Sequence, residues 1–325
     1  ADRLTVLRDG ATVSGMERGE ITENRSIRDR VGRDMAHRYP AREPRIGEVL
    51  MQVKDWSVWH PLHSDRQVIR DCNLTVRRGE VVGIAGLMGA GRTEFAMSLF
   101  GRSWGAKISG EVTIGGKLAD LSSVPAAINA GLAYVTEDRK QLGLILDDAV
   151  AILAAVNAED RKALGLVLDE TILRNTSMAN LPGVSSRGVI DANRERRVAE
   201  DYKSQLNTRT PTVFQRVVNL SGGNQQKVVL AKWLFTDPDV LILDEPTRGI
   251  DVGAKFEIYS IINTLADQGR GVILISSEMP ELLGICDRIY VMNKGAFVGE
   301  FDRAEASQER IMESIMAGDR VAEGN

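Results

Sequence analysis

Short, mostly apolar runs outline the predicted fold of this chain. Four of them span five residues each, at 81–85, 132–136, 240–244 and 272–276, and polar or glycine-rich residues follow each one. Strands of a parallel sheet are buried on both faces, so they read as continuous apolar runs rather than alternating ones. Segments of helical composition, such as residues 94–100, lie between them. The pattern predicts an α/β fold with a buried parallel sheet.

A glycine-rich loop follows the first run and leads into a helical segment. It consists of Gly86, Leu87, Met88, Gly89, Ala90, Gly91, Arg92 and Thr93, with Glu94 next. This is P-loop spacing, in which backbone N–H groups surround phosphates, a lysine reaches the outer phosphates and Ser or Thr ligates Mg²⁺. Arg92 stands at the lysine position and replaces a compact ammonium with a wide planar fork. The loop therefore favours nucleotide binding over fast hydrolysis, with a plain tight turn as the alternative.

Two further motifs lie downstream of the loop. The run at 240–244 ends in adjacent carboxylates, Asp244 and Glu245, which a parallel strand would deliver to its carboxyl edge. Asp244 is predicted to hold Mg²⁺ through water, and Glu245 to orient or deprotonate an attacking water. An acidic turn is the alternative for this motif alone. A serine and two glycines open a long helical segment just upstream, in the sequence Leu220, Ser221, Gly222, Gly223, Asn224, Gln225.

Together these residues resemble the ATP-binding cassette ATPases. The resemblance implies a P-loop nucleotide-hydrolase core of that type, with an antiparallel β element, a helical subdomain, and ATP and Mg²⁺ as ligands. It identifies residues 220–225 as the signature, Asp244 and Glu245 as the Walker B pair, and Asp251 as the D-loop aspartate. In that family two cassettes meet head to tail, and each ATP lies between one P-loop and the other signature.

Several positions depart from the family pattern. Arg92 replaces the P-loop lysine, Glu137 stands where a glutamine approaches Mg²⁺ and the attacking water, and Ser277 stands where a histidine contacts the γ-phosphate. Trp59 best matches the adenine-stacking aromatic, with Trp56 as a rival and core packing as an equal alternative. The departures concern the site at the chain's own P-loop, whereas the signature is intact. The resemblance therefore implies a chain that completes a partner's hydrolytic site and turns over its own nucleotide slowly.

An internal repeat predicts the domain organisation. Residues 1–13 repeat the pattern of residues 286–298, which would form the last hairpin of the cassette. We therefore expect 1–47 to contain the tail of a preceding cassette, a charged helical stretch and a linker. We expect the cassette at 48–317, and residues 318–325 to form a C-terminal tail. Within the cassette, the helical subdomain is expected at about 141–229, with an internal loop at 181–188.

The chain also resembles one subgroup of the family. The sequences GLMGAGRTE, TEDRK, LSGGNQQK and ISSEMPEL are similar to the ATPase subunits of ribose-, galactose- and xylose-type carbohydrate importers. This implies a preceding cassette in the same polypeptide, transmembrane permease subunits and, indirectly, a sugar-binding protein. It also implies a peripheral position on the cytoplasmic face of the inner membrane. The sequence contains no apolar run long enough to cross a membrane and no evident signal peptide.

One segment is duplicated. Residues 137–148 recur as 159–170, with nine of twelve residues identical at an offset of 22. A local tandem duplication explains two copies, because a solenoid needs at least about three. In the family this region faces the membrane subunits, so an insert at 145–166 is predicted to alter docking there. A tolerated surface loop is the alternative.

Bulk properties separate the remaining functions. A formal net charge of −4 with 26% charged residues indicates no basic surface for nucleic acid. The two cysteines, Cys72 and Cys286, lack metal-ligand spacing and indicate a reducing compartment. Two alternatives stay open: a self-sufficient homodimeric ATPase in which Arg92 replaces the lysine, and a soluble cassette protein without a role in transport. Turnover by the isolated chain would favour the former, and nucleic-acid binding at physiological salt would favour one form of the latter.

Overall fold

A six-stranded sheet forms the centre of the fold. The computed structural model describes residues 2–8, 11–21, 39–63, 65–136 and 166–323. The sheet has the order β14-β13-β5-β12-β11-β8, in which only β14 is antiparallel to its neighbour. In that order the strands are Ala296–Asp302, Arg288–Asn293, Val81–Ala85, Gly271–Ile275, Val240–Asp244 and Leu132–Val135. The four apolar runs are thus confirmed as neighbouring parallel strands.

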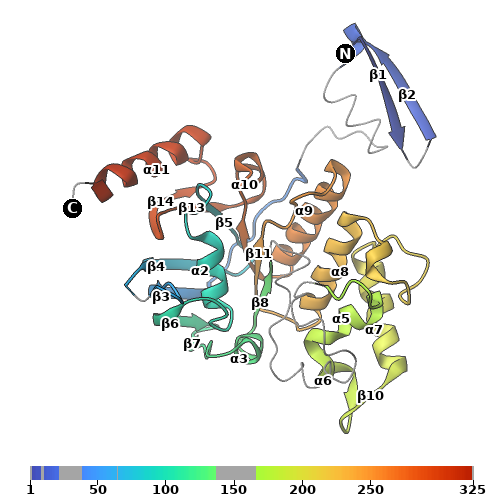
Figure 1. The fold of residues 1–325 in the computed structure, drawn as a ribbon, viewed down its shortest axis with the longest axis horizontal. Coiled ribbons are helices and arrows are strands. Elements are labelled where there is room, and N and C mark those ends of the chain that lie inside the picture. Colours follow the sequence, from blue (N-terminus) through green and yellow to red (C-terminus); the bar gives the residue numbers. More distant parts are fainter. Residues whose placement is uncertain (1, 9–10, 22–38, 64, 137–165, 324–325) are drawn as a thin grey trace.

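The predicted antiparallel element is a separate four-stranded sheet, β4-β3-β6-β7. Its strands, in that order, are Gln67–Arg77, Val49–Trp59, Ala106–Ile114 and Lys117–Leu118. Helix α2 (Arg92–Leu99) lies between the two sheets and contacts β4 and β11 (Figure 1). Helix α3 (Val124–Asn129) precedes β8 and is capped by the Ser123 side chain, which accepts a hydrogen bond from the Ala126 amide.

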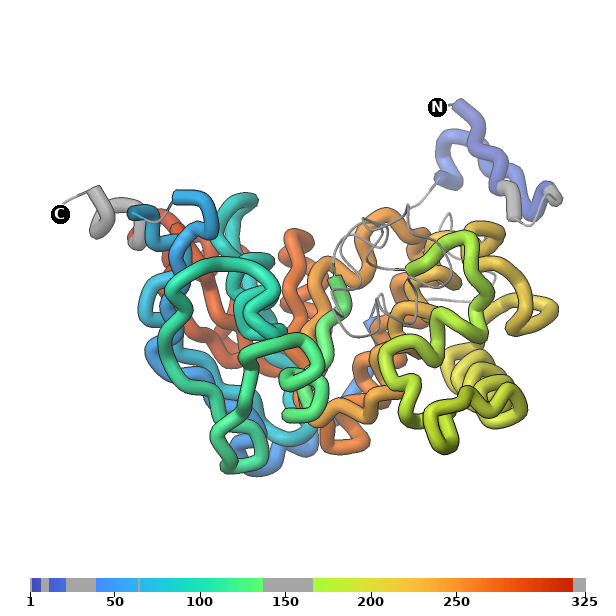
Figure 2. The backbone as a smooth tube through the Cα atoms, turned by 60° about the horizontal axis from the view of Figure 1, so that its bottom comes forward, coloured from blue at the N-terminus to red at the C-terminus, as the bar shows by residue number. Residues whose placement is uncertain are grey.

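The helical subdomain lies at the other end of the molecule from the antiparallel sheet (Figure 2). It contains α5 (Ile172–Ser177), η2 (Met178–Asn180), α6 (Leu181–Val184), β9 (Ser185–Ser186), β10 (Val189–Ile190), α7 (Ala192–Gln205), η3 (Val217–Asn219) and α8 (Gly222–Leu234). The loop expected at 181–188 is wrong, because a short helix and a two-stranded turn occupy it. The Asn180 side chain caps α6 at the Gly183 amide, and Pro182 suits the first helical turn.

Two more helices flank the central sheet, and a third ends the described chain. They are α9 (Val252–Asp267), α10 (Met279–Ile285) and α11 (Gln308–Glu323). Apolar side chains from both sheets and these helices form one continuous buried cluster. Helix α11 continues past the boundary expected at residue 317, through Gly318, and Ile311 and Ile315 are buried in its earlier part.

The first described residues form a hairpin of β1 (Arg3–Arg8) and β2 (Ala11–Glu17), followed by η1 (Arg18–Glu20). Its pairing reproduces that of β13 and β14 at an offset of 285 residues. Arg3 pairs with Glu17 as Arg288 pairs with Asp302, and both hairpins shift register after the equivalent valine. The repeat found in the sequence is therefore also a repeat of pairing geometry. The expected helical stretch at 22–35 and most of the duplicated segment lie outside the described residues.

Candidate functional site

The P-loop connects β5 to α2. Gly91 is the residue before the helix, with φ 103°, and Gly89 has φ 80°. Only glycine adopts these left-handed conformations readily. A Cβ at Gly86 would lie 2.6 Å from the Met292 carbonyl oxygen, so this position also requires glycine. The helix begins at Arg92, two residues earlier than the sequence indicated, and its amino end faces the loop as expected for a phosphate site.

Arg92 turns away from the loop toward the ends of the neighbouring strands. Its Nη1 donates a hydrogen bond to the Ser276 carbonyl oxygen at 2.6 Å. Its Nη2 lies 3.8 Å from Glu245 Oε1, and both side chains are largely buried. The arginine that replaces the P-loop lysine is thus paired with the carboxylate predicted to activate water.

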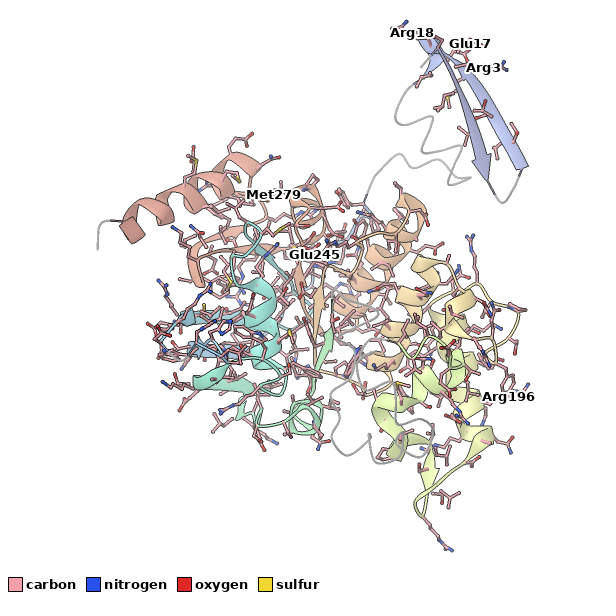
Figure 3. All side chains as sticks on the ribbon, in the orientation of Figure 1. Arg3, Glu17, Arg18, Arg196, Glu245 and Met279 are labelled. Carbon is pink, nitrogen blue, oxygen red and sulfur yellow. The ribbon has the colours of Figure 1, made fainter. Side chains whose placement is uncertain are left out.

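Glu245 is held on several sides at the end of β11 (Figure 3). Its backbone has φ 49° and its amide donates to the Ile275 carbonyl oxygen at 2.9 Å. Ser277 Oγ donates to Glu245 Oε2 at 3.1 Å. Burial raises the pKa of Glu245, which the Ser277 hydrogen bond and the charge of Arg92 offset in part. Arg92, Glu245 and Ser277, named separately from the sequence, therefore form one cluster.

Asp244 is fully buried beside that cluster. Tyr134 donates its phenolic hydrogen to Asp244 Oδ2 at 3.0 Å, and the Thr93 side chain lies beside the same carboxylate and lowers its pKa. Burial raises the pKa of Asp244 to about 6. Asp244 Oδ1 is buried without a hydrogen-bond partner in the described structure. A carboxylate oxygen without a donor, next to the P-loop threonine, fits the site of a divalent cation.

Sequence reasoning missed the role of Tyr134. Its position in the apolar run at 132–136 suggested only core packing. The register of β8 beside β11 puts Tyr134 opposite Ile242, within reach of Asp244. A polar-tipped aromatic two residues from the end of the apolar run at 132–136 was the available signal.

The signature opens α8 with Ser221 as the residue before the helix. Asn224 Nδ2 donates to Ser221 Oγ at 3.0 Å, and Asn224 Oδ1 accepts from the Arg209 amide at 2.9 Å. Gln225 Nε2 donates to the Val217 carbonyl oxygen at 3.2 Å. Leu220 is buried, whereas Ser221 is exposed. The signature is therefore held by its own neighbours and presents its serine outward.

The D-loop aspartate lies at the start of the helix that packs on the signature. Asp251 caps α9 by accepting from the Ala254 amide at 3.0 Å. A Cβ at Gly223 would lie 2.6 Å from the Ala254 Cβ, so glycine allows α8 and α9 to approach closely here. The signature helix α8 and the helix that Asp251 caps are thus in direct contact.

The two tryptophans proposed for adenine stacking differ in environment. Trp56 is buried, and its Nε1 donates to Ser98 Oγ at 2.9 Å. Trp59 is partly exposed at the end of β3. A Cβ at Gly91 would lie 3.1 Å from Ile69, which pairs with the residue before Trp59, so this end of the sheet adjoins the P-loop. The environments leave Trp59 as the better candidate, and its role stays a prediction.

Other predicted features concern residues 137, 72 and 286. Glu137 lies outside the described residues. Cys72 and Cys286 are both free and buried. Within the described ranges, no cluster of three or more His, Cys, Asp or Glu side chains could hold a metal ion. In that same part of the chain, no helix combines the length and apolar character needed to cross a membrane.

A family model described as ABC transporter matches residues 69–248, and the chain belongs to this family. It is 53% identical over 326 residues to the L-arabinose transport ATP-binding protein AraG of Geobacillus stearothermophilus, covering 100% of the chain and 59% of that protein. It is 45% identical to the xylose import ATP-binding protein XylG of Thermoanaerobacter pseudethanolicus, covering 98% and 58%. The ribose import ATP-binding protein RbsA of Bacillus subtilis is 40% identical, with coverage of 98% and 58%. The chain thus spans little more than half the length of these curated relatives.

Solved structures agree on the fold. An ATP-binding cassette of an ABC transporter in its ADP conformation matches with a TM-score of 0.62 at 17% identity, covering 83% of this chain and 96% of that one. A dimeric cassette bound to ADP and inorganic phosphate after hydrolysis matches with a TM-score of 0.60 at 19% identity, covering 78% and 99%. The predicted fold class is therefore confirmed.

Proposed function

We propose that this chain is one cassette of the ATP-binding subunit of a carbohydrate importer, with ATP and Mg²⁺ as ligands. The relatives named for arabinose, xylose and ribose transport support a pentose or related sugar as cargo. The P-loop conformation and the adjacent buried carboxylate support nucleotide binding. Coupling of ATP binding and hydrolysis to transport follows from this assignment.

The observation that carries the finer proposal is the pairing of Arg92 with Glu245. The cation that should reach the outer phosphates instead contacts the candidate general base at 3.8 Å, and Ser277 donates to the same carboxylate. A carboxylate engaged by two donors is less available to accept a proton from water. We infer that the chain's own P-loop site turns over slowly, and that the exposed Ser221 completes the site of a partner cassette.

Magnesium would be held by the Thr93 hydroxyl and, through water, by Asp244. Bound there, the ion would neutralise charge on the nucleotide phosphates. Tyr134 orients Asp244 through the hydrogen bond to Oδ2, while Oδ1 has no hydrogen-bond partner among the described residues. Thr93 lies in the first turn of α2 and is fixed by that helix.

The hairpin β1–β2 supports a preceding cassette in the same polypeptide. In the equivalent hairpin, β13 pairs with β5, and Arg288 Nε donates to Glu80 Oε1 at 2.9 Å. The equivalent Arg3 side chain is 71% exposed and contacts only Glu17 at 3.7 Å among the described ion pairs. We propose that the β1 edge and Arg3 meet the corresponding strand and glutamate of a preceding cassette.

The partners follow from the importer assignment. They are transmembrane permease subunits and, indirectly, a sugar-binding protein, with this chain peripheral on the cytoplasmic face of the inner membrane. No nucleic-acid partner is proposed. The insert at 145–166 would lie toward the permease, and transport left unchanged by its deletion would count against a docking role.

Steady-state hydrolysis of ATP with Mg²⁺, measured on this chain beside its Glu245→Gln variant, tests the division of labour. We expect nucleotide binding with turnover at background in both proteins. Turnover that Glu245→Gln abolishes would favour the alternative of a self-sufficient homodimeric ATPase, which the retained charge of Arg92 and the intact Glu245 make chemically possible. Addition of a cassette with a lysine P-loop should restore turnover, and Ser221→Arg should prevent that restoration.

A further inference from the structure

The linker segment, defined here as residues 39–42, is docked against the cassette. The ring centroid of Tyr39 lies 5.4 Å from that of Tyr259 on α9, with the planes tilted by 47°. A Cβ at Gly284 on α10 would lie 2.4–2.6 Å from three ring atoms of Tyr39. The ring therefore fills space that only glycine leaves free, between two helices that each lead back to the site.

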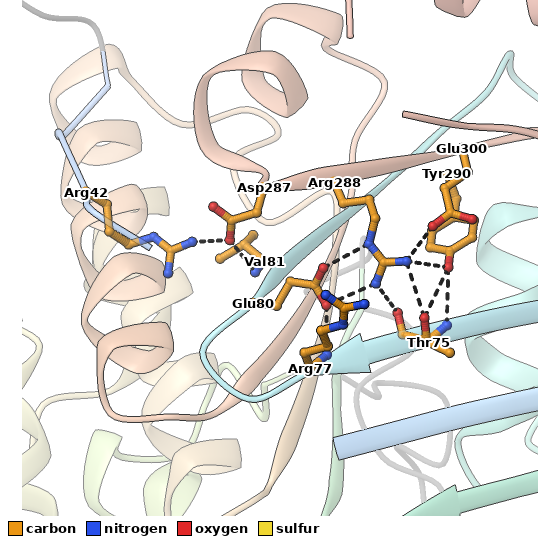
Figure 4. A network of polar contacts seen from close by, with 9 residues as sticks. All are labelled: Arg42, Thr75, Arg77, Glu80, Val81, Asp287, Arg288, Tyr290 and Glu300. Atoms are coloured by element: carbon orange, nitrogen blue, oxygen red, sulfur yellow. Dashed lines mark hydrogen bonds and ion pairs between the residues drawn. The ribbon is translucent and has the colours of Figure 1, made fainter. Parts of the chain in front are cut away.

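A second anchor holds the same segment. The Arg42 side chain is 3% exposed and forms an ion pair with Asp287, which is 4% exposed. Arg42 Nη1 also donates to the Gly79 carbonyl oxygen at 2.9 Å. Asp287 Oδ2 accepts from the amide of Val81, the first residue of the strand that ends at the P-loop (Figure 4). Because a buried charge that loses its partner is costly, this contact fixes the linker to the base of β5.

A buried polar chain runs from the Tyr39 contact to the catalytic loop. Burial and the neighbouring Glu281 carboxylate raise the pKa of Tyr259, whose hydroxyl lies beside Glu281 and Thr247. Thr247 Oγ1 in turn donates to Glu281 Oε1 at 2.6 Å, and all three side chains are buried. Thr247 is two residues beyond Glu245. The side chain against which Tyr39 packs therefore lies beside the hydrogen-bonded pair that holds the loop carrying the candidate base.

The two helices that contact the linker segment, α9 and α10, also begin within two residues of site residues. Helix α9 starts after Asp251, and α10 starts two residues after Ser277. Lys255 of α9 forms an ion pair with Glu278 at the start of α10, which ties the two starts together. A shift of α9 against α10 would thus move Asp251, Ser277 and Glu245 relative to one another.

We propose that Tyr39 and Arg42 are positioning residues for the nucleotide site. Docking of the linker segment sets the packing of α9 against α10 and, through Tyr259 and Thr247, the position of Glu245. Movement of whatever precedes the linker, the β1–β2 hairpin included, is thereby transmitted to the site. This proposal rests on the proposed function, because it assumes that the site binds nucleotide.

The test uses the 325-residue chain with Mg-ADP as the probe, and variants that disturb or spare the contact. Tyr39→Ala removes the ring and Tyr39→Phe keeps it. Gly284→Ala inserts a Cβ where the ring lies, while alanine favours the helix, so it separates loss of docking from loss of folding. Phe214→Ala is the matched control, because Phe214 is an exposed aromatic in the helical subdomain.

Two readouts decide the outcome: hydrogen exchange of the peptide covering residues 244–251, and the dissociation constant of Mg-ADP. Tyr39→Ala and Gly284→Ala should raise exchange there, as expected of local opening, and weaken Mg-ADP binding by roughly 2- to 30-fold. Tyr39→Phe and Phe214→Ala should match the unmodified chain. Unchanged exchange, or raised exchange with unchanged affinity, would overturn the proposal. If the unmodified chain binds no Mg-ADP, the proposed function fails, and exchange at 244–251 alone then decides the positioning role.

Discussion

The amino ends of α2 and α8 are alike in their backbone but differ in the side chains around them. Helix α2 follows the glycine-rich P-loop and α8 begins with Gly222 and Gly223, so both present backbone amides at the first turn. At α2 the loop's own arginine reaches across to Glu245. At α8 the polar side chains of the signature bond to their local neighbours, and Ser221 stays exposed. A helix amino end suits phosphate in general, but side chains from other elements decide which molecule it can serve.

The largest expected difference between the P-loop region and the signature is in how stabilisation by Mg²⁺ depends on pH. Asp244 has a folded pKa of about 6, against an ordinary value of 3.8, so the stability that its neutral form contributes is fully present below about pH 3.8 and is lost as the pH rises through about 6. Mg²⁺ favours the ionised form. In the presence of ADP, the amount by which Mg²⁺ raises the free energy of unfolding should therefore grow as the pH rises from about 3.8 to about 6, by up to roughly 3 kcal/mol.

Chemical unfolding at about pH 5 and about pH 8, with and without Mg²⁺, measures this effect. Asp244→Asn should remove the pH dependence of the Mg²⁺ effect on stability. The signature residues 220–225 contain no ionisable side chain, so Ser221→Ala should leave it intact. A Mg²⁺ effect that is equal at both pH values would contradict the assignment of Asp244.

Next in size is the loss of nucleotide affinity on Arg92→Ala. In the described structure Arg92 contacts Ser276 and Glu245, and we expect its guanidinium to turn to the phosphates when Mg-ADP binds. Charge-assisted hydrogen bonds contribute about 1.5–3 kcal/mol, so the dissociation constant of Mg-ADP should then rise by roughly 10- to 150-fold on Arg92→Ala. Ser221→Ala in the same isolated chain should bind as the unmodified protein does, because the signature serves another molecule's nucleotide. Isothermal titration calorimetry on the unmodified chain, Arg92→Ala and Ser221→Ala measures this difference. Equal losses of affinity in both variants would show that the P-loop and the signature serve the same nucleotide.

Arg92→Lys should make the P-loop side more active. A shorter, more mobile cation would release Glu245, and even part of the usual contribution of a general base would raise turnover by about tenfold. Steady-state ATP hydrolysis measures it, and the double variant Arg92→Lys with Glu245→Gln is the control that should return to background. No gain in turnover would mean that Ser277 or the described fold around it, rather than Arg92, limits the site.

The smallest effect is expected at the signature. Asn224→Ala removes the hydrogen bonds to Ser221 and to the Arg209 amide, and should lower the free energy of unfolding by about 1 kcal/mol. Nucleotide affinity of the isolated chain should not change. Thermal unfolding measures the loss of stability, and titration with Mg-ADP measures the affinity. A loss of affinity would show that the signature acts on the chain's own nucleotide.

Much of the core was predictable, because buried parallel strands leave a plain signal. The run at 240–244 became β11 with the same bounds, and the run at 272–276 became a strand shifted by one residue. The expected loop at 181–188 instead contains a short helix at 181–184, which the Asn180 side chain caps, followed by a two-stranded turn. Local composition favoured a loop, whereas the side-chain cap satisfies an amide at the start of the helix.

The sequence by itself determined the motifs, their order along the chain and the family resemblance, since spacing alone defines a P-loop, a signature and a pair of carboxylates. It also contained the repeat that the two hairpins share. Only the tertiary structure decided that Arg92 pairs with Glu245, that Tyr134 orients Asp244, and that Tyr39 lies between α9 and α10. These contacts join residues distant in sequence, and strand register and helix packing, which no local pattern encodes, bring them together.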